Sequence, residues 1–433
     1  MKNNIYACLE IGSSEARILV GNIRENRIYI LSTHRVETEG LENGHVAQLG
    51  PLVQKLKSLK VYVESDLNQP LQTVTLSIPS VDVNMESLQV QLDLDSDEAI
   101  GSEQIKKLFR QAMSRPAPIE TVSVNLLPRL FKVDDQEATS NPLGQKGRLL
   151  TMEASRAVAP SMLVYELINA VELAGFRVGD IMAGSTAEVL YSLGLVEPGK
   201  QVCHINIGKF STTISIADGG KIYSTKSLSV GGQDATEDIS EALHVDEKTA
   251  NRLKHHFGSL QSRANPQEFI YVNESETGFS CITRGMLENV LIGRYEMILK
   301  VVKQYLTENA IKTGNMDYVL SGGASEIGGF VEFAQQFFGA NVVLQRPSML
   351  GIRQTKYARL VGMAILAHEL ALLTGQKAQI IDFAQYANAK EAVVPDKVGR
   401  PEQEMSKTFM DHKLENSGVL VRLFDKMFDE KAE

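Results

Sequence analysis

The chain has 433 residues, of which 43% are hydrophobic and 22% charged, and its formal net charge is −9. This length exceeds one ordinary hydrophobic core, so we expect several subdomains, and the composition excludes a wholly disordered or fibrous chain. The negative charge argues against broad binding to nucleic acid. The cysteines form no C-x-x-C unit, and we see neither a leader nor about 18 consecutive apolar residues. We therefore expect a reducing cytosol and no disulfide framework, structural zinc site or membrane span.

Two distant segments share one pattern, a β-rich run, a turn with glycine and small hydroxyl residues, and a second β-rich run. The first extends from Cys8 to Gly21 and the second from His204 to Gly219. Each pattern predicts a β-hairpin. A single such hairpin is usually only structural, but its repetition predicts a duplicated architecture and favours a shared site.

The segments around these hairpins change in character along the chain. Residues 84–160 mix β-rich runs with a helix predicted from its cap at Ser102 to Met113, which indicates an inserted α+β subdomain. A helical pattern follows from Ser161 to Leu195, with a stop at Gly175. Later helices are predicted over Ala235–Leu243 and Gly285–Thr307, from near Phe330, and over Leu360–Leu373.

Two double-glycine turns follow the second hairpin. Gly231-Gly232 precedes a helix, and Gly322-Gly323 lies between a β-rich run and the helix near Phe330. A strand, a glycine turn and a helix suit a bound phosphate or nucleotide, but they also serve close packing. Each turn alone is therefore a weak indication of a site.

The C-terminal part combines a linker with an amphipathic segment. Residues 384–416 carry prolines and glycines among charged residues and lack apolar periodicity, so we expect a flexible linker. Within 417–433, apolar residues recur at steps of three and four, which predicts a short amphipathic helix for a membrane surface or a partner's groove. The apolar positions are Leu420, Leu423, Phe424, Met427 and Phe428.

The ordered set of these features resembles FtsA, the actin-like family of bacterial cell-division proteins. Residues 40–46 and 141–147 are similar to two further motifs of that family. The resemblance implies an α/β, actin/Hsp70-like fold of duplicated ribonuclease H-like domains, with an inserted α+β subdomain, a linker and a C-terminal amphipathic helix. It divides the chain into a first actin-like subdomain (1–83 and 161–199), the insert (84–160), a second core subdomain (200–227 and 308–383), a partner-binding subdomain (228–307), the linker (384–416) and the helix (417–433).

The resemblance also implies an ATP site at the hairpins and glycine turns. Its positions here are Glu10, Gly12, Ser13, Ser14, Asn206, Gly208, Lys209, Phe210, Ser211, Thr212, Gly231, Gly232, Asn251, Lys254, Gly322 and Gly323. In actin-like ATPases, carboxylates at the hairpins orient magnesium and water while glycines let backbone N–H groups surround the phosphates.

The sequence departs from the family at this site. Asn206 and Thr213 replace the two aspartates of the second hairpin, Lys209 and Phe210 replace two glycines, and Asn251 replaces a glutamate. We therefore expect no catalytic residues and no hydrolysis. Binding of ATP without turnover, with or without Mg²⁺, and an empty cleft kept for assembly both stay open.

The resemblance implies a scaffold on the cytoplasmic face of the cell membrane at the division site. Its expected partners are the FtsZ C-terminal tail, further copies of itself in a filament, later division proteins and the lipid surface. Arg294 aligns with the family's basic residue for the FtsZ tail, although a solvated helix charge explains it equally well. The alternatives are an ATPase whose polymerisation is driven by turnover and a PilM-like pilus scaffold.

Overall fold

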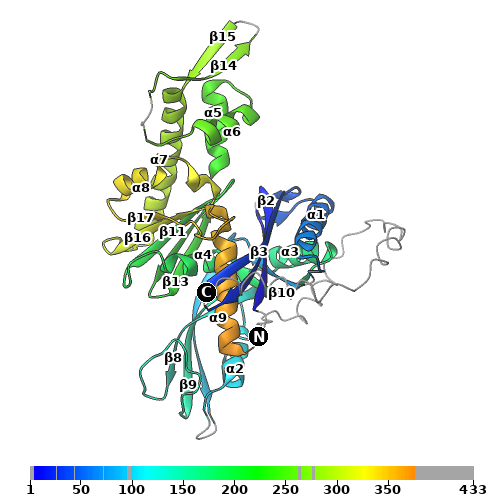
Figure 1. Cartoon of the computed structure of the whole chain (residues 1–433). Coiled ribbons are helices and arrows are strands. Elements are labelled where there is room, and N and C mark those ends of the chain that lie inside the picture. The colour runs from blue at the N-terminus through cyan, green and yellow to red at the C-terminus, as the bar shows by residue number, and fades with distance from the viewer. Residues whose placement is uncertain are drawn as a thin grey trace, which may run out of the picture.

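The computed structural model describes residues 4–25, 27–42, 44–71, 73–94, 99–261, 265–275 and 278–375. The predicted linker and terminal helix lie outside these residues. Figure 1 shows an elongated molecule with two lobes side by side and strands β8 and β9 at one end. The hairpin of β14 and β15 lies at the opposite end.

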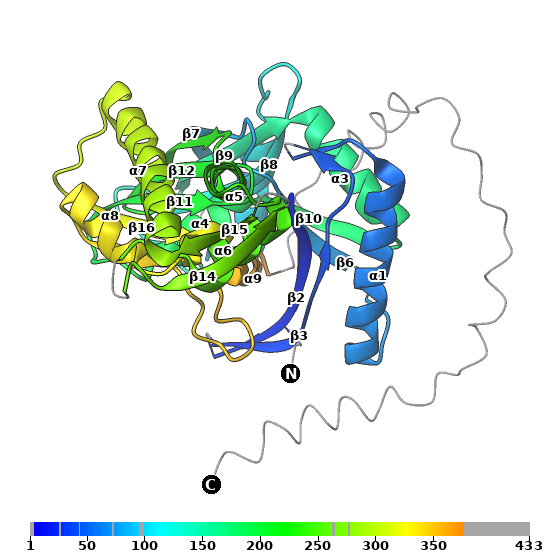
Figure 2. The same ribbon diagram turned by 90° about the horizontal axis from the view of Figure 1, so that it is seen from above.

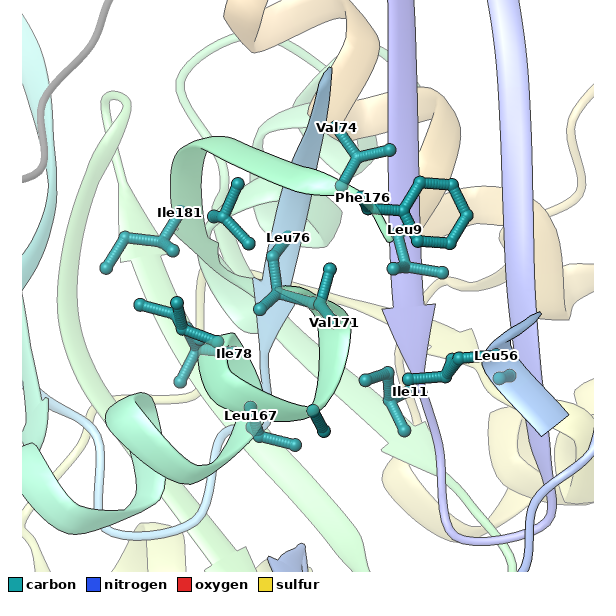
Figure 3. Packing of buried hydrophobic residues seen from close by; sticks show 14 of the residues in the cluster. Leu9, Ile11, Leu56, Val74, Leu76, Ile78, Leu167, Val171, Phe176 and Ile181 are labelled. Atoms are coloured by element: carbon teal, nitrogen blue, oxygen red, sulfur yellow. The ribbon is translucent and has the colours of Figure 1, made fainter. Parts of the chain in front are cut away.

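The first lobe is built on a five-stranded sheet of order β10-β6-β1-β2-β3. Strands β1 (Ile5–Ile11), β2 (Glu15–Arg24) and β3 (Arg27–Glu37) are antiparallel, while β6 (Thr73–Ile78) and β10 (Arg177–Ala183) continue the sheet in parallel. Helices α1 (Leu49–Leu67) and α3 (Ser161–Leu173) cover one face, beside the small pair β4 (Leu41–Glu42) and β5 (His45–Val46). Figure 3 shows part of this core, where Ile11 of β1 lies near Leu56 of α1 and Leu76 of β6 lies near Val171 of α3.

The second lobe repeats this arrangement in a sheet of order β13-β12-β11-β16-β17. Strands β11 (Gln201–Ile207), β12 (Thr212–Asp218) and β13 (Lys221–Leu228) are antiparallel, and β16 (Met316–Ser321) and β17 (Val342–Leu344) are parallel additions. The two sheets thus have the same order and strand directions. The duplication predicted from the two hairpins is confirmed.

Helices and one hairpin extend the second lobe. They are α5 (Gly232–Leu243), α6 (Glu247–Phe257), β14 (Phe269–Ser275), β15 (Gly278–Thr283), α7 (Arg284–Glu308), the 3-10 helix η1 (Gly323–Glu326) and α8 (Phe330–Phe338). Seen from above, α7 and α8 lie on the far side of the second sheet from the first lobe (Figure 2). Buried residues of these helices form one core with β11 and β12.

The inserted segment forms a three-stranded antiparallel sheet of order β7-β9-β8 with one helix. Its elements are β7 (Asn84–Asp93), α2 (Ser102–Met113), β8 (Thr121–Val133) and β9 (Leu149–Pro160). The prediction that Ser102 caps the helix is wrong, because Gly101 is the N-cap. Gln104 accepts a hydrogen bond from the Gly101 amide at 3.0 Å, so a glutamine three residues into the helix does the capping.

The helical pattern predicted for Ser161–Leu195 is also wrong in its middle. Gly175 ends α3 as expected, but the buried strand β10 follows before α4 (Gly184–Leu193) begins. Strand β10 lies at one edge of the first sheet, but all of its residues after Arg177 are buried, so its sequence has no period of two. Short apolar runs of this kind cannot be told from helix by periodicity alone.

Helix α9 (Ala358–Thr374), preceded by the 3-10 helix η2 (Thr355–Tyr357), passes through the centre of the molecule (Figure 1). It packs on α4, β1 and β2. Gly362 permits this, because a Cβ there would lie 2.2 Å from the Ala187 carbonyl oxygen. Among the described residues, Thr355–Thr374 is the one helix whose length and hydropathy would suit a membrane span, and 72% of that window is buried, as in the core helix of a folded domain.

Candidate functional site

A cleft of about 870 Å³ lies between the lobes, lined by residues of both hairpins. Its size is ordinary for a small-molecule or cofactor site. Most residues of the predicted nucleotide site line it, although they come from distant parts of the chain. They are Glu10, Gly12, Ser13, Ser14, Asn206, Gly208, Lys209, Phe210, Ser211, Gly232, Asn251, Lys254, Gly322 and Gly323.

The two hairpin turns are closed by the same backbone hydrogen bond. In the first, the Gly12 amide donates to the Glu15 carbonyl at 3.0 Å, and in the second the Gly208 amide donates to the Ser211 carbonyl at 2.8 Å. The replacement of two family glycines by Lys209 and Phe210 has therefore left the turn intact. Both side chains are exposed at its tip, with the Lys209 ammonium 4.7 Å from the Phe210 ring centroid.

Two residues of the predicted site lie behind the cleft wall. Thr212 is fully buried, and its hydroxyl donates to the Val230 carbonyl at 2.7 Å. Gly231 packs so closely on the second turn that a Cβ there would lie 2.7 Å from the Lys209 carbonyl oxygen. These residues hold the second hairpin against the start of α5 and do not face the cleft.

Lys254 on α6 brings a partly buried cation to the cleft. Its ammonium donates to the Gly232 carbonyl at 2.6 Å and to the Thr236 hydroxyl at 2.5 Å. Burial, reinforced by the nearby charge of Lys209, lowers the pKa of Lys254 to about 8, although Glu247 acts in the opposite direction. One of the three ammonium donors remains for an anion in the cleft.

The alternation of side chains along β1 and β11 points Glu10 and Asn206 toward α4 and α9. There they meet Glu188 of α4 and Arg359 of α9. Asn206 Nδ2 donates to Glu188 Oε1 at 2.8 Å and to Ser321 Oγ at 3.0 Å. Arg359 donates from Nη1 to Glu10 Oε1 at 2.8 Å and from Nη2 to Glu188 Oε2 at 3.2 Å.

Glu188 and Arg359 belong to no recognised motif and were not predicted as site residues. A signal was present, since Glu188 is the one charged residue of α4 and Arg359 is a lone arginine in the otherwise apolar start of α9. A charged residue in an apolar helix needs a buried partner. Burial lowers the pKa of Arg359, but the adjacent Glu188 and Glu10 outweigh it and raise the pKa above its ordinary value.

The mouth of the cleft carries a second set of ion pairs around Glu15. Its carboxylate binds the Lys356 ammonium at 3.2 Å and also pairs with Arg35. These cations lower the pKa of Glu15 despite its partial burial. Arg17 is held by the Lys356 carbonyl at 2.6 Å and approaches Glu10 at 3.5 Å.

The cleft fits a nucleotide better than it fits Mg²⁺. Its volume, its two matching turns and the cations Lys209, Lys254 and Arg17 suit a phosphate chain. Mg²⁺ requires six oxygens in near-ideal octahedral geometry, several of them usually from carboxylates, phosphates and water. Within the described residues, no three His, Cys, Asp or Glu side chains are grouped so that they could hold a metal ion.

Arg294, the residue predicted to bind a partner, lies outside the cleft on α7. Its guanidinium makes a two-pronged contact with Asp238 of α5 at 2.5 and 2.6 Å and lies 4.0 Å from Asp234. Arg294 is thus paired within its own lobe. The five predicted membrane-binding residues lie outside the described residues.

Comparison with known proteins decides the family. The family model "Cell division protein FtsA" matches residues 203–362, and "SHS2 domain inserted in FTSA" matches residues 82–156, together more than half of the chain. The chain belongs to the FtsA family. The predicted family is confirmed, and a role in bacterial cell division at the division site follows from it.

Relatives match over most of their length. FtsA of Bacillus subtilis is 26% identical over 382 residues, which cover 87% of this chain and 86% of that protein. FtsA of Enterococcus faecalis is 25% identical over 411 residues, covering 94% of this chain and 90% of that protein. The second family model lies close to the predicted insert, while the other subdomain boundaries remain predictions.

Two solved structures share the fold. The PilM–PilN type IV pilus biogenesis complex matches with a TM-score of 0.57 and 17% identity, covering 84% of this chain and 98% of that chain. MreB5 of Spiroplasma citri bound to ADP matches with a TM-score of 0.50 and 14% identity, covering 89% and 98%. These likenesses confirm the predicted actin-like fold class. The pilus-scaffold alternative shares only this fold, whereas the family models are those of FtsA.

Proposed function

We propose that this FtsA-family chain is a filament-forming scaffold that tethers FtsZ to the cytoplasmic face of the cell membrane. It also links FtsZ to later division proteins. Membership of the FtsA family carries the proposal. The cleft supports a structural role for a bound nucleotide, since its turns and cations suit phosphates while Glu10 and Glu188 are tied to Arg359.

Reconstitution on vesicles tests the tethering role. FtsZ polymers, mixed with the full chain and vesicles of phosphatidylethanolamine and phosphatidylglycerol, should float with the lipid. FtsZ without the chain should stay in the dense fraction. Equal flotation of FtsZ with and without the chain would contradict the proposal.

Phosphate release from Mg-ATP, measured without FtsZ, distinguishes the proposed scaffold from the alternative of an active ATPase. We expect no release above the buffer rate, because Asn206 and Thr213 are neutral and Glu10 is paired with two arginines. Release that disappears in Asn206→Ala or Glu10→Ala would favour an enzyme driven by turnover. No release together with ADP binding would favour a structural nucleotide.

Nucleotide affinity is expected to depend on pH through Lys254. The pKa of Lys254 is lowered to about 8, so the ammonium loses its proton as the pH rises through that value. A phosphate is attracted to the protonated form only, so ADP should bind about tenfold more weakly at pH 9 than at pH 7. Calorimetric titration should show this fall in the natural chain and a flat profile in Lys254→Met. If ADP affinity changes with pH equally in the natural chain and in Lys254→Met, Lys254 does not contact the nucleotide.

An acidic FtsZ tail is expected to compete with Asp238 for Arg294. Arg294→Glu should weaken binding of the FtsZ C-terminal peptide by about tenfold, and Asp238→Asn, which frees the guanidinium, should strengthen it. Fluorescence anisotropy measures both, with circular dichroism to show that the fold is kept. Unchanged affinity in both variants would mean that Arg294 serves only its own lobe.

A further inference from the structure

The guanidinium of Arg359 lies at the base of the cleft, in a space formed by two carboxylates and a glycine. Its side chain is 13% exposed and is flanked by the carboxylates of Glu10 and Glu188, which are 6% and 4% exposed. Gly184, the first residue of α4, leaves the space for it, because a Cβ there would lie 2.7 Å from Arg359 Nε. The close contact of α9 with α4 at Gly362 fixes the start of α9 above this space.

This arrangement brings two carboxylates from two elements to one cation. Glu10 is the residue before the last in β1, the leading strand of the first hairpin, and Glu188 contacts the second hairpin by accepting a hydrogen bond from Asn206. Both Glu188 oxygens are engaged, one by Asn206 and the other by Arg359. Glu10 Oε1 is shared by Arg359 and Arg17, and within the described residues Glu10 Oε2 is buried without a hydrogen-bond partner.

A divalent cation at this place would meet both steric and electrostatic opposition. Mg²⁺ needs oxygen ligands at about 2.0–2.1 Å in octahedral array, and of the four carboxylate oxygens only Glu10 Oε2 is disengaged. The ion would also have to approach a guanidinium in a poorly solvated site, where like charges repel strongly. Arginine suits this place because its charge is permanent and its planar fork can serve two carboxylates at once.

We propose that Arg359 is a built-in cation that takes the place of a divalent metal ion between Glu10 and Glu188. The cleft consequently takes its nucleotide as the metal-free anion, with phosphates facing Lys209, Lys254 and Arg17. The replacement of a metal ion by Arg359 is argued from this chain's own residues. The binding of a metal-free nucleotide rests on the nucleotide binding proposed above. Removing the guanidinium should open a divalent-cation site.

Manganese binding to the full chain, followed by electron paramagnetic resonance of free Mn²⁺, tests the first part without nucleotide. The natural chain should bind no Mn²⁺ that depends on Glu188. Arg359→Ala should gain one equivalent that disappears when Glu188→Gln is added. Arg35→Ala is the matched control, because it removes another arginine from the cleft wall and leaves the Glu10 and Glu188 contacts intact. It should gain no such site.

If Arg359→Ala does not fold, Mn²⁺ binding by the natural chain still tests the proposal. One equivalent of Mn²⁺ bound by the natural chain and lost in Glu188→Gln would overturn it. Gly184→Ala is a milder variant, because the added methyl group displaces the guanidinium of Arg359 without removing it. Mn²⁺ should then raise the unfolding temperature of Gly184→Ala but not that of the natural chain. Failure of every folded variant to gain Mn²⁺ would also count against the proposal.

Calorimetric titration with ADP tests the second part. Affinity in the natural chain should be no tighter in excess Mg²⁺ than in excess EDTA, because Mg²⁺ complexes ADP in solution and leaves less of the metal-free anion. Arg359→Ala should instead bind about tenfold more tightly with Mg²⁺ than in EDTA. A tenfold loss in EDTA for the natural chain would contradict the metal-free cleft. No ADP binding under either condition would overturn the nucleotide part of the proposed function, while the Mn²⁺ result would still decide the role of Arg359.

Discussion

Replacing Arg156 by alanine is expected to destabilise the inserted subdomain by about 3–5 kcal/mol. Arg156 lies on β9 and is 2% exposed. Its guanidinium binds Glu86 of β7 through two nitrogens, at 3.0 and 2.5 Å, and donates to the carbonyls of Ala112, Arg115 and Pro116 at the end of α2. The variant leaves these carbonyls and the carboxylate without their donor, and it leaves a void between helix and sheet.

Arg129→Ala is the matched control for this prediction. Arg129 lies on β8 of the same sheet and pairs with Glu153, but both side chains are substantially exposed, so its loss should cost no more than about 1 kcal/mol. Amide hydrogen exchange of α2 and β8 measures the effect within a multidomain chain, where a single unfolding transition is not assured. Similar protection in the two variants would show that Arg156 contributes no more than a surface pair.

The duplicated architecture could be predicted from the sequence because it depends on short, continuous sequence patterns. Each hairpin has two β-rich runs around a short turn, and the repetition of that unit predicts two related sheets. Helices α5, α7 and α8 also follow from apolar periodicity. Strand β10 was not predicted because a strand buried on both faces shows no alternation of apolar and polar residues. The N-cap of α2 was predicted wrongly because Gln104, and not Ser102, accepts the hydrogen bond that caps the helix.

The cleft was only half predictable, for a different reason. Residues in the two turns are recognised because each turn is a continuous motif, and the structure brings them to one cleft. Glu188 and Arg359 lie 171 positions apart on two helices, and their contact depends on the packing of α9 against α4. The sequence therefore predicts that the second hairpin has lost its acids, but not that the neighbouring carboxylates are already held by an arginine.

This difference changes how the altered hairpin is interpreted. From the sequence, the neutral Asn206 is a loss that removes a magnesium ligand. In the structure, Asn206 is a donor to Glu188, whose other oxygen binds Arg359, so the amide completes a hydrogen-bonded set that an aspartate at this position would disrupt by repulsion. Asn206→Asp should therefore not restore a working metal site unless Arg359 is removed as well.

Deleting the residues after Asn416 is expected to abolish flotation of the chain with vesicles. This prediction rests on the sequence, in which five apolar side chains, Leu420, Leu423, Phe424, Met427 and Phe428, recur at helical spacing. Each contributes at most about 1.5–3 kcal/mol on burial, from which the cost of ordering the helix is subtracted, so one copy binds reversibly. A filament presents many copies, and their combined attachment is much firmer.

Two serine substitutions on opposite faces of the predicted helix separate membrane insertion from other causes. Phe424→Ser removes a large side chain from the apolar stripe and should reduce flotation strongly, whereas Asp425→Ser alters the polar face and should leave flotation intact or raise it on anionic vesicles. Flotation unaffected by the deletion would place the membrane contact elsewhere in the chain. Equal losses in the two serine variants would contradict insertion of the apolar stripe into the lipid surface, because Asp425 lies on the polar face of the predicted helix.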